Sequence, residues 1–326
     1  MKINSEYHTI GGNKIAEEGK SEKYKIYRKK WHENPKKYII EDFPLFLDID
    51  ITDICNLRCP FCLRISNPEV IKNEKMSFEM FKKIIDEGSK NGLYGVKLNI
   101  IGEPLIHEKV DDFVSYAKKK GLVDVYFNTN ATLLDKEIGK KLINSKLDRL
   151  SISFEGFTKD VYEKNRVGSK FEKVLSNIKN FKNLRGEMGV DYPKIRIQTV
   201  LLPELQAIIQ DYKNFWLEIV DEIGFLDYQP RVEEKNDVII GDWACPQLWQ
   251  RMGILVDGTI IPCNHDEKAL SKLGNIKNTS IKEAWHSDKL NKLRKLHENS
   301  EAHKGNSCRY CYLRWSEVDK LKKGDK

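Results

Sequence analysis

Three cysteines lie close together in the stretch Cys55-Asn-Leu-Arg-Cys59-Pro-Phe-Cys62. Their thiolates can hold three irons of a [4Fe–4S] cube, and because ferredoxin-type cubes use four cysteine ligands, the fourth iron would lack a local thiolate. A missing protein ligand leaves an open coordination position at which chemistry can occur. The alternatives are a zinc knuckle or a chance grouping. Zinc takes four ligands, often with a nearby histidine, and no histidine lies between Phe43 and His107.

The other four of the seven cysteines lie in the C-terminal part of the chain, at Cys245, Cys263, Cys308 and Cys311. Four thiolates can ligate all four irons of a second cluster, which would then conduct electrons and offer no open position. A structural zinc site held by the same four cysteines is the alternative, and the ligand set by itself does not exclude it. The seven cysteines thus divide into three plus four, with none left over.

The C-x3-C-x2-C run resembles the signature of radical S-adenosylmethionine (SAM) enzymes. In that family the open iron binds the amino and carboxylate groups of SAM. The resemblance covers roughly residues 45–230. It implies reductive cleavage of SAM to a radical that removes a hydrogen from a small-molecule substrate. It also implies an external electron donor such as flavodoxin or ferredoxin.

Two short segments resemble the SAM-binding motifs of the family. Gly102 and Glu103 resemble the end of a Gly-Gly-Glu motif that binds the SAM amino group, with Ile101 in place of the first glycine. Arg166, in an Arg-x-Gly-x-x-Phe context, matches an arginine that pairs with the SAM carboxylate. A guanidinium suits a carboxylate because it can form two parallel hydrogen bonds. The structural alternatives are an ordinary turn at Gly102-Glu103 and a solvated helix-start residue at Arg166.

Three further residues match family positions in the SAM pocket. Phe61 precedes the last cysteine of the run, where the family usually has an aromatic residue beside the adenine, although loop packing would also explain it. Asn128 opens Asn128-Thr129-Asn130, where related enzymes often read Thr-Asn-Gly. Ser153 resembles a position that contacts the SAM ribose. The resemblance therefore implies that all three residues contribute to cofactor binding.

The C-terminal cysteines resemble those of SPASM/twitch extensions. The shared pattern is C-x12-G-x4-C, then Leu273-Gly-Asn, Ser280-Ile-x-Glu, and finally C-x2-C. A full SPASM extension has seven cysteines and two auxiliary clusters. The four cysteines here imply the shorter twitch form with one auxiliary [4Fe–4S] cluster, and hence two [4Fe–4S] clusters in the chain.

Alternating strand and helix patterns predict the element order that would position these residues. Strands are expected over 45–51, 96–101, 123–127, 150–154, 195–202 and 225–229. Apolar positions at helical spacing fall between them, over 78–85, 110–117, 135–142, 171–181 and 208–219. About six β/α units predict an α/β protein with an open, curved (β/α)6 partial barrel, as the resemblance to radical SAM enzymes also implies. The cysteine run follows the first strand, at the end of a parallel sheet where ligand-binding loops lie.

Charge and composition define the expected domains. The net charge is +7, and residues 1–40 carry ten Lys and Arg against five Glu, whereas residues 286–326 carry eleven against six acidic residues. We expect a basic N-terminal extension over 1–43, a radical SAM core over 44–231 and a twitch-type domain over 232–326. Solvated lysine faces are commoner than nucleic-acid sites, so a nucleic-acid partner is not favoured.

The sequence favours a cytoplasmic protein. The start of the chain has no apolar signal-peptide segment, and no apolar run approaches the roughly 18 residues of a membrane span.

The leading functional hypothesis is oxidation of an alcohol carbon in a sugar, aminosugar or cyclitol. The cysteine spacing is most similar to that of twitch-type dehydrogenases, in which the auxiliary cluster accepts the second electron. Arg231, Tyr228 and Gln229 follow the last expected strand, and Arg231 and Tyr228 are the candidate catalytic residues. A surface salt bridge of Arg231 with Glu233 or Glu234 is the structural alternative. Epimerisation, peptide modification, and a non-catalytic iron–sulfur or zinc regulatory protein remain open as functions.

Overall fold

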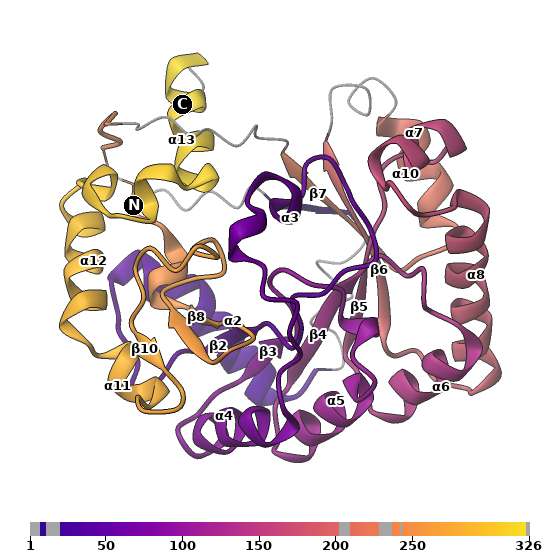
Figure 1. Cartoon of the computed structure of the whole chain (residues 1–326), viewed down its shortest axis with the longest axis horizontal. Coiled ribbons are helices and arrows are strands. Elements are labelled where there is room, and N and C mark those ends of the chain that lie inside the picture. Colours follow the sequence, from indigo (N-terminus) through magenta and orange to yellow (C-terminus); the bar gives the residue numbers. More distant parts are fainter. Residues whose placement is uncertain (1–6, 11–19, 202–208, 228–236, 242, 324–326) are drawn as a thin grey trace.

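The computed structural model describes residues 7–10, 20–201, 209–227, 237–241 and 243–323. Its described strands form one sheet in the order β1-β7-β6-β5-β4-β3-β2-β8-β9-β10 (Figure 1). Six neighbouring strands run parallel: β2 (Phe46–Ile49), β3 (Gly95–Lys97), β4 (Asp124–Thr129), β5 (Arg149–Ser153), β6 (Lys194–Leu201) and β7 (Glu222–Asp227). The six predicted strands and the α/β partial-barrel fold are thereby confirmed.

Helices join the parallel strands and line the outside of the curved sheet (Figure 1). They are α4 (Phe78–Lys90), α5 (Val110–Lys119), α6 (Lys136–Asn144), α7 (Lys159–Asn165), α8 (Phe171–Glu187) and α10 (Ile209–Leu217). Each of the longer ones buries an apolar face, as the spacing predicts. Ser77 caps α4 by accepting a hydrogen bond from the N–H of Met80.

The two faces of the sheet differ in chemistry because successive strand residues point to opposite sides. In β5, Leu150 and Ile152 are fully buried in the main apolar core beneath the helices. Ser151 and Ser153 alternate with them and therefore face the concave interior. The side chain of Ser151 donates a hydrogen bond to Gln198 of β6 at 3.3 Å. The concave face is thus polar.

Four described strands extend the sheet beyond the predicted six. β1 (Tyr7–Ile10) pairs antiparallel with β7 at one edge. β8 (Arg251–Ile254) pairs parallel with β2 and carries β9 (Thr259–Ile261) and β10 (Gly274–Asn275) on its far side. The sequence analysis predicted no strand here, and β8 falls within residues 232–326, the range expected for the twitch-type domain. Its pairing with β2 shows that this part of the chain continues the sheet of the core.

The remaining C-terminal elements are short. They are η3 (Pro246–Trp249), α11 (Ile281–Trp285), α12 (Asp288–Glu298), η4 (Ala302–Lys304), η5 (Cys308–Tyr310) and α13 (Tyr312–Lys323). Ser280 and Glu283 form a reciprocal capping box at the start of α11, as the sequence predicts.

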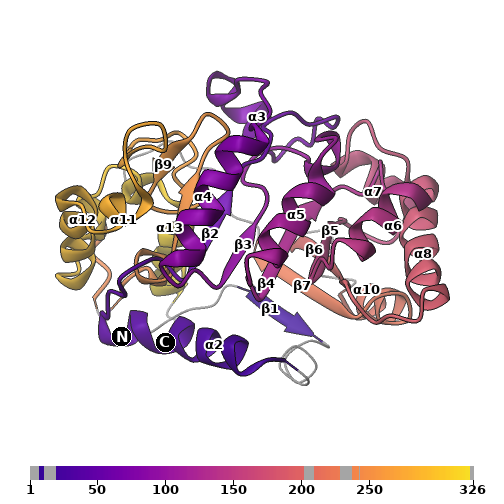
Figure 2. The ribbon, with the colours of Figure 1, turned by 90° about the horizontal axis from the view of Figure 1, so that it is seen from below.

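Helix α2 (Glu22–Lys37) covers the end of the sheet from which the parallel strands start. Tyr24 and Tyr27 of this helix pack with Leu45 and Phe46, at the start of β2, in a separate buried cluster. The cysteine-loop helix α3 (Leu63–Ser66) lies on the opposite side (Figure 2). α2 therefore closes one end of the partial barrel and leaves the other to the loops that follow the strands. Among the described residues, no helix is long and apolar enough to cross a membrane.

Candidate active site

The first three cysteines occupy the loop between β2 and α3. Cys59 is buried and Cys55 and Cys62 are half-buried, and all three thiols are free. The N–H of Cys62 donates to the carbonyl of Cys59 at 3.0 Å, and Cys62 is the N-cap of α3. The loop therefore lies at the carboxyl end of the first parallel strand, where the sequence predicts it.

Asp53 fixes the segment that follows the cysteine loop. Its buried carboxylate accepts hydrogen bonds from the N–H groups of Lys72, Asn73 and Glu74, at 2.5, 3.2 and 2.7 Å. These contacts hold residues 72–74 against the end of β2. Asp53 was not among the predicted site residues.

The end of β3 makes direct contact with the entry to the cysteine loop. Asp50 Oδ1 accepts from the N–H groups of Ile100, Ile101 and Gly102 at 2.9, 3.0 and 3.4 Å, and the N–H of Glu103 donates to the carbonyl of Ile54 at 2.8 Å. Burial raises the pKa of Asp50 to about 6.

Gly102 permits this close approach of the two backbone segments. A Cβ at Gly102 would lie 2.0 Å from the carbonyl oxygen of Thr52 and 2.8 Å from that of Ile54. A glycine is therefore required where the chain passes the cysteine loop, apart from any contact with SAM.

Glu103 is buried beside the same loop and organises the end of β4. Its carboxylate accepts from the Thr129 hydroxyl at 2.6 Å, the Asn130 N–H at 2.7 Å and the Leu105 N–H at 3.1 Å. Burial raises its pKa, against these hydrogen bonds. Asn130 in turn lies against the cysteine loop, with its amide nitrogen 4.0 Å from Cys55 Sγ. Binding of the SAM amino group by Glu103 stays a prediction.

Arg166 contacts the cysteine loop directly. Its Nη1 lies 3.6 Å from Cys59 Sγ, and its guanidinium lies 5.5 Å from the centre of the Phe61 ring. Its Nε and Nη2 donate to the two carboxylate oxygens of Glu155, the second at 2.8 Å. Burial acts to lower the pKa of Arg166, but Glu155 and Cys59 outweigh it and raise the pKa. Arg166 is thus held as a cation beside Cys59.

Glu155 is the partner that the sequence analysis missed. The structure shows that the two-pronged hydrogen bond expected between Arg166 and the SAM carboxylate is made instead with a protein carboxylate that is almost wholly buried. Only Nη1 is directed to the cysteine loop. A contact between Arg166 and SAM stays a prediction.

The other predicted cofactor contacts lie on neighbouring strands. The N–H of Asn128 donates to Asn99 Oδ1 at 3.0 Å, and Ser153 is opposite Gln198 in the register of β5 and β6. Both residues sit at the carboxyl ends of their strands, which is the correct end of the sheet for the predicted role. Tyr228, Gln229 and Arg231 lie outside the described residues.

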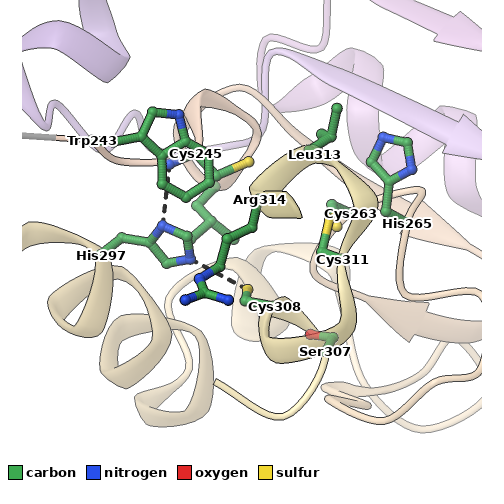
Figure 3. Close-up of a pocket in the computed structure, with 11 residues that line it drawn as sticks. Trp243, Cys245, Cys263, His265, His297, Ser307, Cys308, Cys311, Leu313 and Arg314 are labelled. Carbon is green, nitrogen blue, oxygen red and sulfur yellow. Dashed lines mark hydrogen bonds between the residues drawn. The ribbon is translucent and has the colours of Figure 1, made fainter. Parts of the chain in front are cut away.

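The second set of cysteines lines one pocket in the C-terminal region (Figure 3). Cys245 precedes η3, Cys263 follows β9, Cys308 is the first residue of η5, and Cys311 directly follows η5. Their side chains come from three chain segments that are distant in sequence. The polar and aromatic residues around them are Trp243, His265, His297, Ser307 and Arg314.

The chemistry of this pocket suits a cationic group held by thiolates. Burial raises the thiol pKa of Cys263, Cys308 and Cys311, the last to about 12, and the neighbouring thiols add to the shift. Four thiols placed together in a buried site become thiolates only when a bound cation compensates their charge. The donor set therefore fits an iron–sulfur cluster. Thiolate chemistry alone would suit zinc as well, although the described side chains are not arranged around a single metal ion.

The first cysteine site fits a cluster for a similar reason. Burial raises the pKa of Cys55 to about 11 and also raises that of Cys59, which the charge of Arg166 opposes. Among the described residues, no group of three or more His, Cys, Asp or Glu side chains is arranged to hold a single metal ion.

Comparison with known families agrees with the two cysteine sites. The Radical SAM superfamily matches residues 49–203, and the SPASM iron-sulfur cluster-binding domain matches residues 245–312. The chain therefore carries a radical SAM domain and a C-terminal SPASM domain. These two domains support a radical SAM enzyme and imply SAM and iron–sulfur clusters as its cofactors.

Similar proteins of known name carry different activities. GTP 3′,8-cyclase of Clostridium perfringens (strain 13 / Type A) is 29% identical over 231 residues, which cover 69% of this chain and 68% of the cyclase. The crystal structure of BtrN, a 2-deoxy-scyllo-inosamine dehydrogenase, in complex with AdoMet and 2-DOIA has a TM-score of 0.55 at 16% identity and covers 83% of this chain and 94% of BtrN. Streptococcus suis SuiB bound to the precursor peptide SuiA has a TM-score of 0.59 at 18% identity, over 87% and 74% of the two chains. At these identities the two structures show the fold alone.

Proposed function

We propose that this protein oxidises an alcohol carbon of a sugar, aminosugar or cyclitol by radical SAM chemistry. The observation that carries the proposal is the spatial division of the cysteines. Three lie on the loop at the open end of the partial barrel, and four line a separate pocket in the SPASM domain. We further propose that each set holds one [4Fe–4S] cluster.

When bound, these groups would supply a radical that removes a hydrogen atom and an acceptor for one electron. The chain provides the cysteine ligands and the surroundings of the first site. Arg166 places a positive charge beside Cys59, and the carboxylate of Glu155 keeps the guanidinium in that position. Glu103 holds the end of β4 against the cysteine loop through Thr129 and Asn130.

We propose that SAM lies across this end of the sheet, against Phe61, Gly102, Glu103, Asn128, Ser153 and Arg166. All six lie on the loops or strand ends that surround the cysteine loop. Arg166 contacts Cys59 directly, and Glu103 is linked to Cys55 through Asn130. Gly102 lies against the backbone that leads into the loop. This arrangement supports one continuous binding region.

The polar concave face supports a substrate rich in hydroxyl groups. Neutral hydrogen-bonding side chains line it on adjacent strands, among them Asn99, Asn128, Ser151 and Gln198. The ion pairs Lys97–Asp48 and Arg196–Glu222 lie on the same face. Such groups can pair with hydroxyls, which an apolar surface would leave without partners. We propose that Arg231 and Tyr228 contribute to catalysis from the segment after β7.

Oxidation requires one electron more than hydrogen removal accounts for. Loss of a hydrogen atom, a proton and an electron converts the alcohol carbon to a ketone, and the second site would take up that electron. The two proposed clusters would use all seven cysteines, so none would be left to return a hydrogen atom as a thiol-dependent epimerase would. An electron donor such as flavodoxin or ferredoxin and a reducing cytoplasm complete the proposal.

Turnover in heavy water tests the reaction class. The reconstituted enzyme is incubated with SAM, a reductant and a panel of candidate cyclitols and sugars, and the products are analysed by mass spectrometry. A ketone two mass units lighter than the alcohol, with one SAM consumed per turnover, is expected. A product of unchanged oxidation state with one carbon-bound deuterium would establish epimerisation instead.

Radical chemistry on GTP is a second candidate, which the 29% identity to GTP 3′,8-cyclase favours. GTP belongs in the same panel. SAM-dependent loss of GTP, with no oxidation of any cyclitol or sugar, would replace the proposed function. Modification of a precursor peptide, as the likeness in fold to SuiB suggests, predicts turnover of peptide alone.

A further inference from the structure

His297 lies between two of the four C-terminal cysteines. It belongs to the buried face of α12, together with Leu290, Leu293 and Arg294, and its side chain is 1% exposed. The ring of Trp243 lies 5.6 Å from the imidazole ring. His297 therefore has a fixed position in the wall of the cysteine pocket (Figure 3).

The hydrogen bonds on either side of the ring define its tautomer. The backbone N–H of Cys245 donates to Nδ1 at 3.1 Å. Nδ1 therefore carries no hydrogen, and the proton of the neutral ring is on Nε2. Nε2 lies 3.2 Å from Cys308 Sγ. The ring thus accepts from the backbone at one cysteine and donates to the sulfur of another.

We propose that His297 is a positioning residue that donates its Nε2–H to the Cys308 ligand and thereby raises the reduction potential of the group bound by the four cysteines. The hydrogen bond draws electron density from the ligand sulfur, and this stabilises the more negative, reduced state. The inference rests on the proposed cluster at this site. It assigns no ligand role to His297, because its two hydrogen bonds occupy both ring nitrogens.

A redox titration tests the proposal in the full-length chain. Cys55, Cys59 and Cys62 are changed together to Ala so that only the second site contributes. In this background, His297→Leu removes the donor, whereas His297→Gln retains an amide that can both accept and donate. Iron content is measured first and should be about four per chain in every variant.

The expected result is a more negative potential in His297→Leu and partial recovery in His297→Gln. Loss of one charge-assisted hydrogen bond corresponds to about a tenfold fall in the reduced-to-oxidised ratio at the wild-type midpoint, or about 59 mV for one electron. His265→Phe is the matched control. His265 lines the same pocket, but its ring packs edge-on against Tyr312 at 4.6 Å and its Nε2 lies 3.5 Å from the Tyr312 hydroxyl, which removes that nitrogen from the Cys308 sulfur, so we expect its loss to leave the potential unchanged.

Electron–nuclear double resonance on the reduced cluster, with ¹⁵N-labelled histidine and an unchanged His297, gives a test that does not depend on folding of the variants. A weak nitrogen coupling and one exchangeable deuteron are expected. A strong coupling would make His297 a ligand, and no coupling would place it out of contact. A strong coupling and an absent coupling would each refute the proposal. An unshifted potential in His297→Leu would also refute it, as would an equal shift in His265→Phe. Zinc at about one per chain and no iron would instead show that the proposed cluster itself is wrong.

Discussion

Gly102→Ala should disrupt the first cysteine site. The new Cβ would lie 2.0 Å from the carbonyl oxygen of Thr52, about 1.4 Å inside the 3.4 Å at which ordinary contact begins. The nearest atoms are all backbone, so no flexible side chain can move aside. The end of β3 must therefore shift from the segment that leads into Cys55.

The free energy of unfolding should fall by about 3 kcal/mol. Overpacking of a well-packed interior costs about 1–3 kcal/mol, and a rigid backbone neighbour places this site at the upper end. A shift also weakens the hydrogen bonds from Gly102 to Asp50 and from Glu103 to Ile54, each worth about 1 kcal/mol. This loss is a large share of the roughly 5–15 kcal/mol that stabilises most domains.

Urea unfolding of the apoprotein, followed by tryptophan fluorescence, measures the change, and iron analysis then shows which site is damaged. We expect Gly102→Ala to lose the iron of the first site and keep that of the second. Gly186→Ala is the control, because nothing lies within 4 Å of its added Cβ. If the free energy of unfolding of Gly102→Ala lies within about 0.5 kcal/mol of that of the unchanged chain, and its iron content is full, the packing argument for Gly102 is wrong.

Three further predictions concern the two sites. Arg166→Ala should weaken SAM binding about tenfold or more. It should also lower the free energy of unfolding, because it leaves the carboxylate of Glu155 charged and unpaired in the interior. Unchanged SAM affinity by calorimetry would contradict a place for Arg166 in the SAM site. Cys59→Ala should abolish reductive SAM cleavage, whereas Cys308→Ala should retain cleavage and lose the oxidised product, and full substrate turnover by the Cys308 variant would exclude the electron-acceptor role. The pKa of Asp50 is about 6 in the folded protein, above its ordinary value of 3.8. The folded state therefore binds more protons in this window, and stability falls as pH rises through it. The free energy of unfolding of Asp50→Asn, relative to that of the unchanged chain, should accordingly rise by about 2 kcal/mol between pH 4 and 7, at 1.36 kcal/mol per pKa unit. A constant difference would contradict this.

Most of the fold could be predicted because its signals are local. The strand before the cysteine loop and the apolar faces of the helices that join the strands depend on residues only a few positions apart. The added strands β1 and β8 could not be predicted in this way, since their pairing with β7 and β2 joins distant parts of the chain.

The sequence predicted the cysteine ligands of the candidate site, but not the side chains that surround them. The cysteine spacing identified both sets of ligands. It did not indicate that the Glu155 carboxylate would accept two hydrogen bonds from the guanidinium of Arg166. That pairing depends on how α7 returns the chain to the end of β5. His297 did have a detectable signal, because Leu290, Leu293, Arg294 and His297 recur at helical spacing and share a buried face. A histidine on such a face, eleven residues before Cys308, indicates a contact that the sequence analysis did not use.

The central claim is that three cysteines hold one cluster and four hold another. Iron and sulfide analysis after anaerobic reconstitution tests it most directly, on the unchanged chain, on Cys55/Cys59/Cys62→Ala and on Cys245/Cys263/Cys308/Cys311→Ala. We predict about eight irons and eight sulfides in the unchanged chain and about four of each in either variant. One zinc and four irons in the unchanged chain, with the zinc lost only when the four C-terminal cysteines are replaced, would contradict the second cluster and the electron transfer assigned to it.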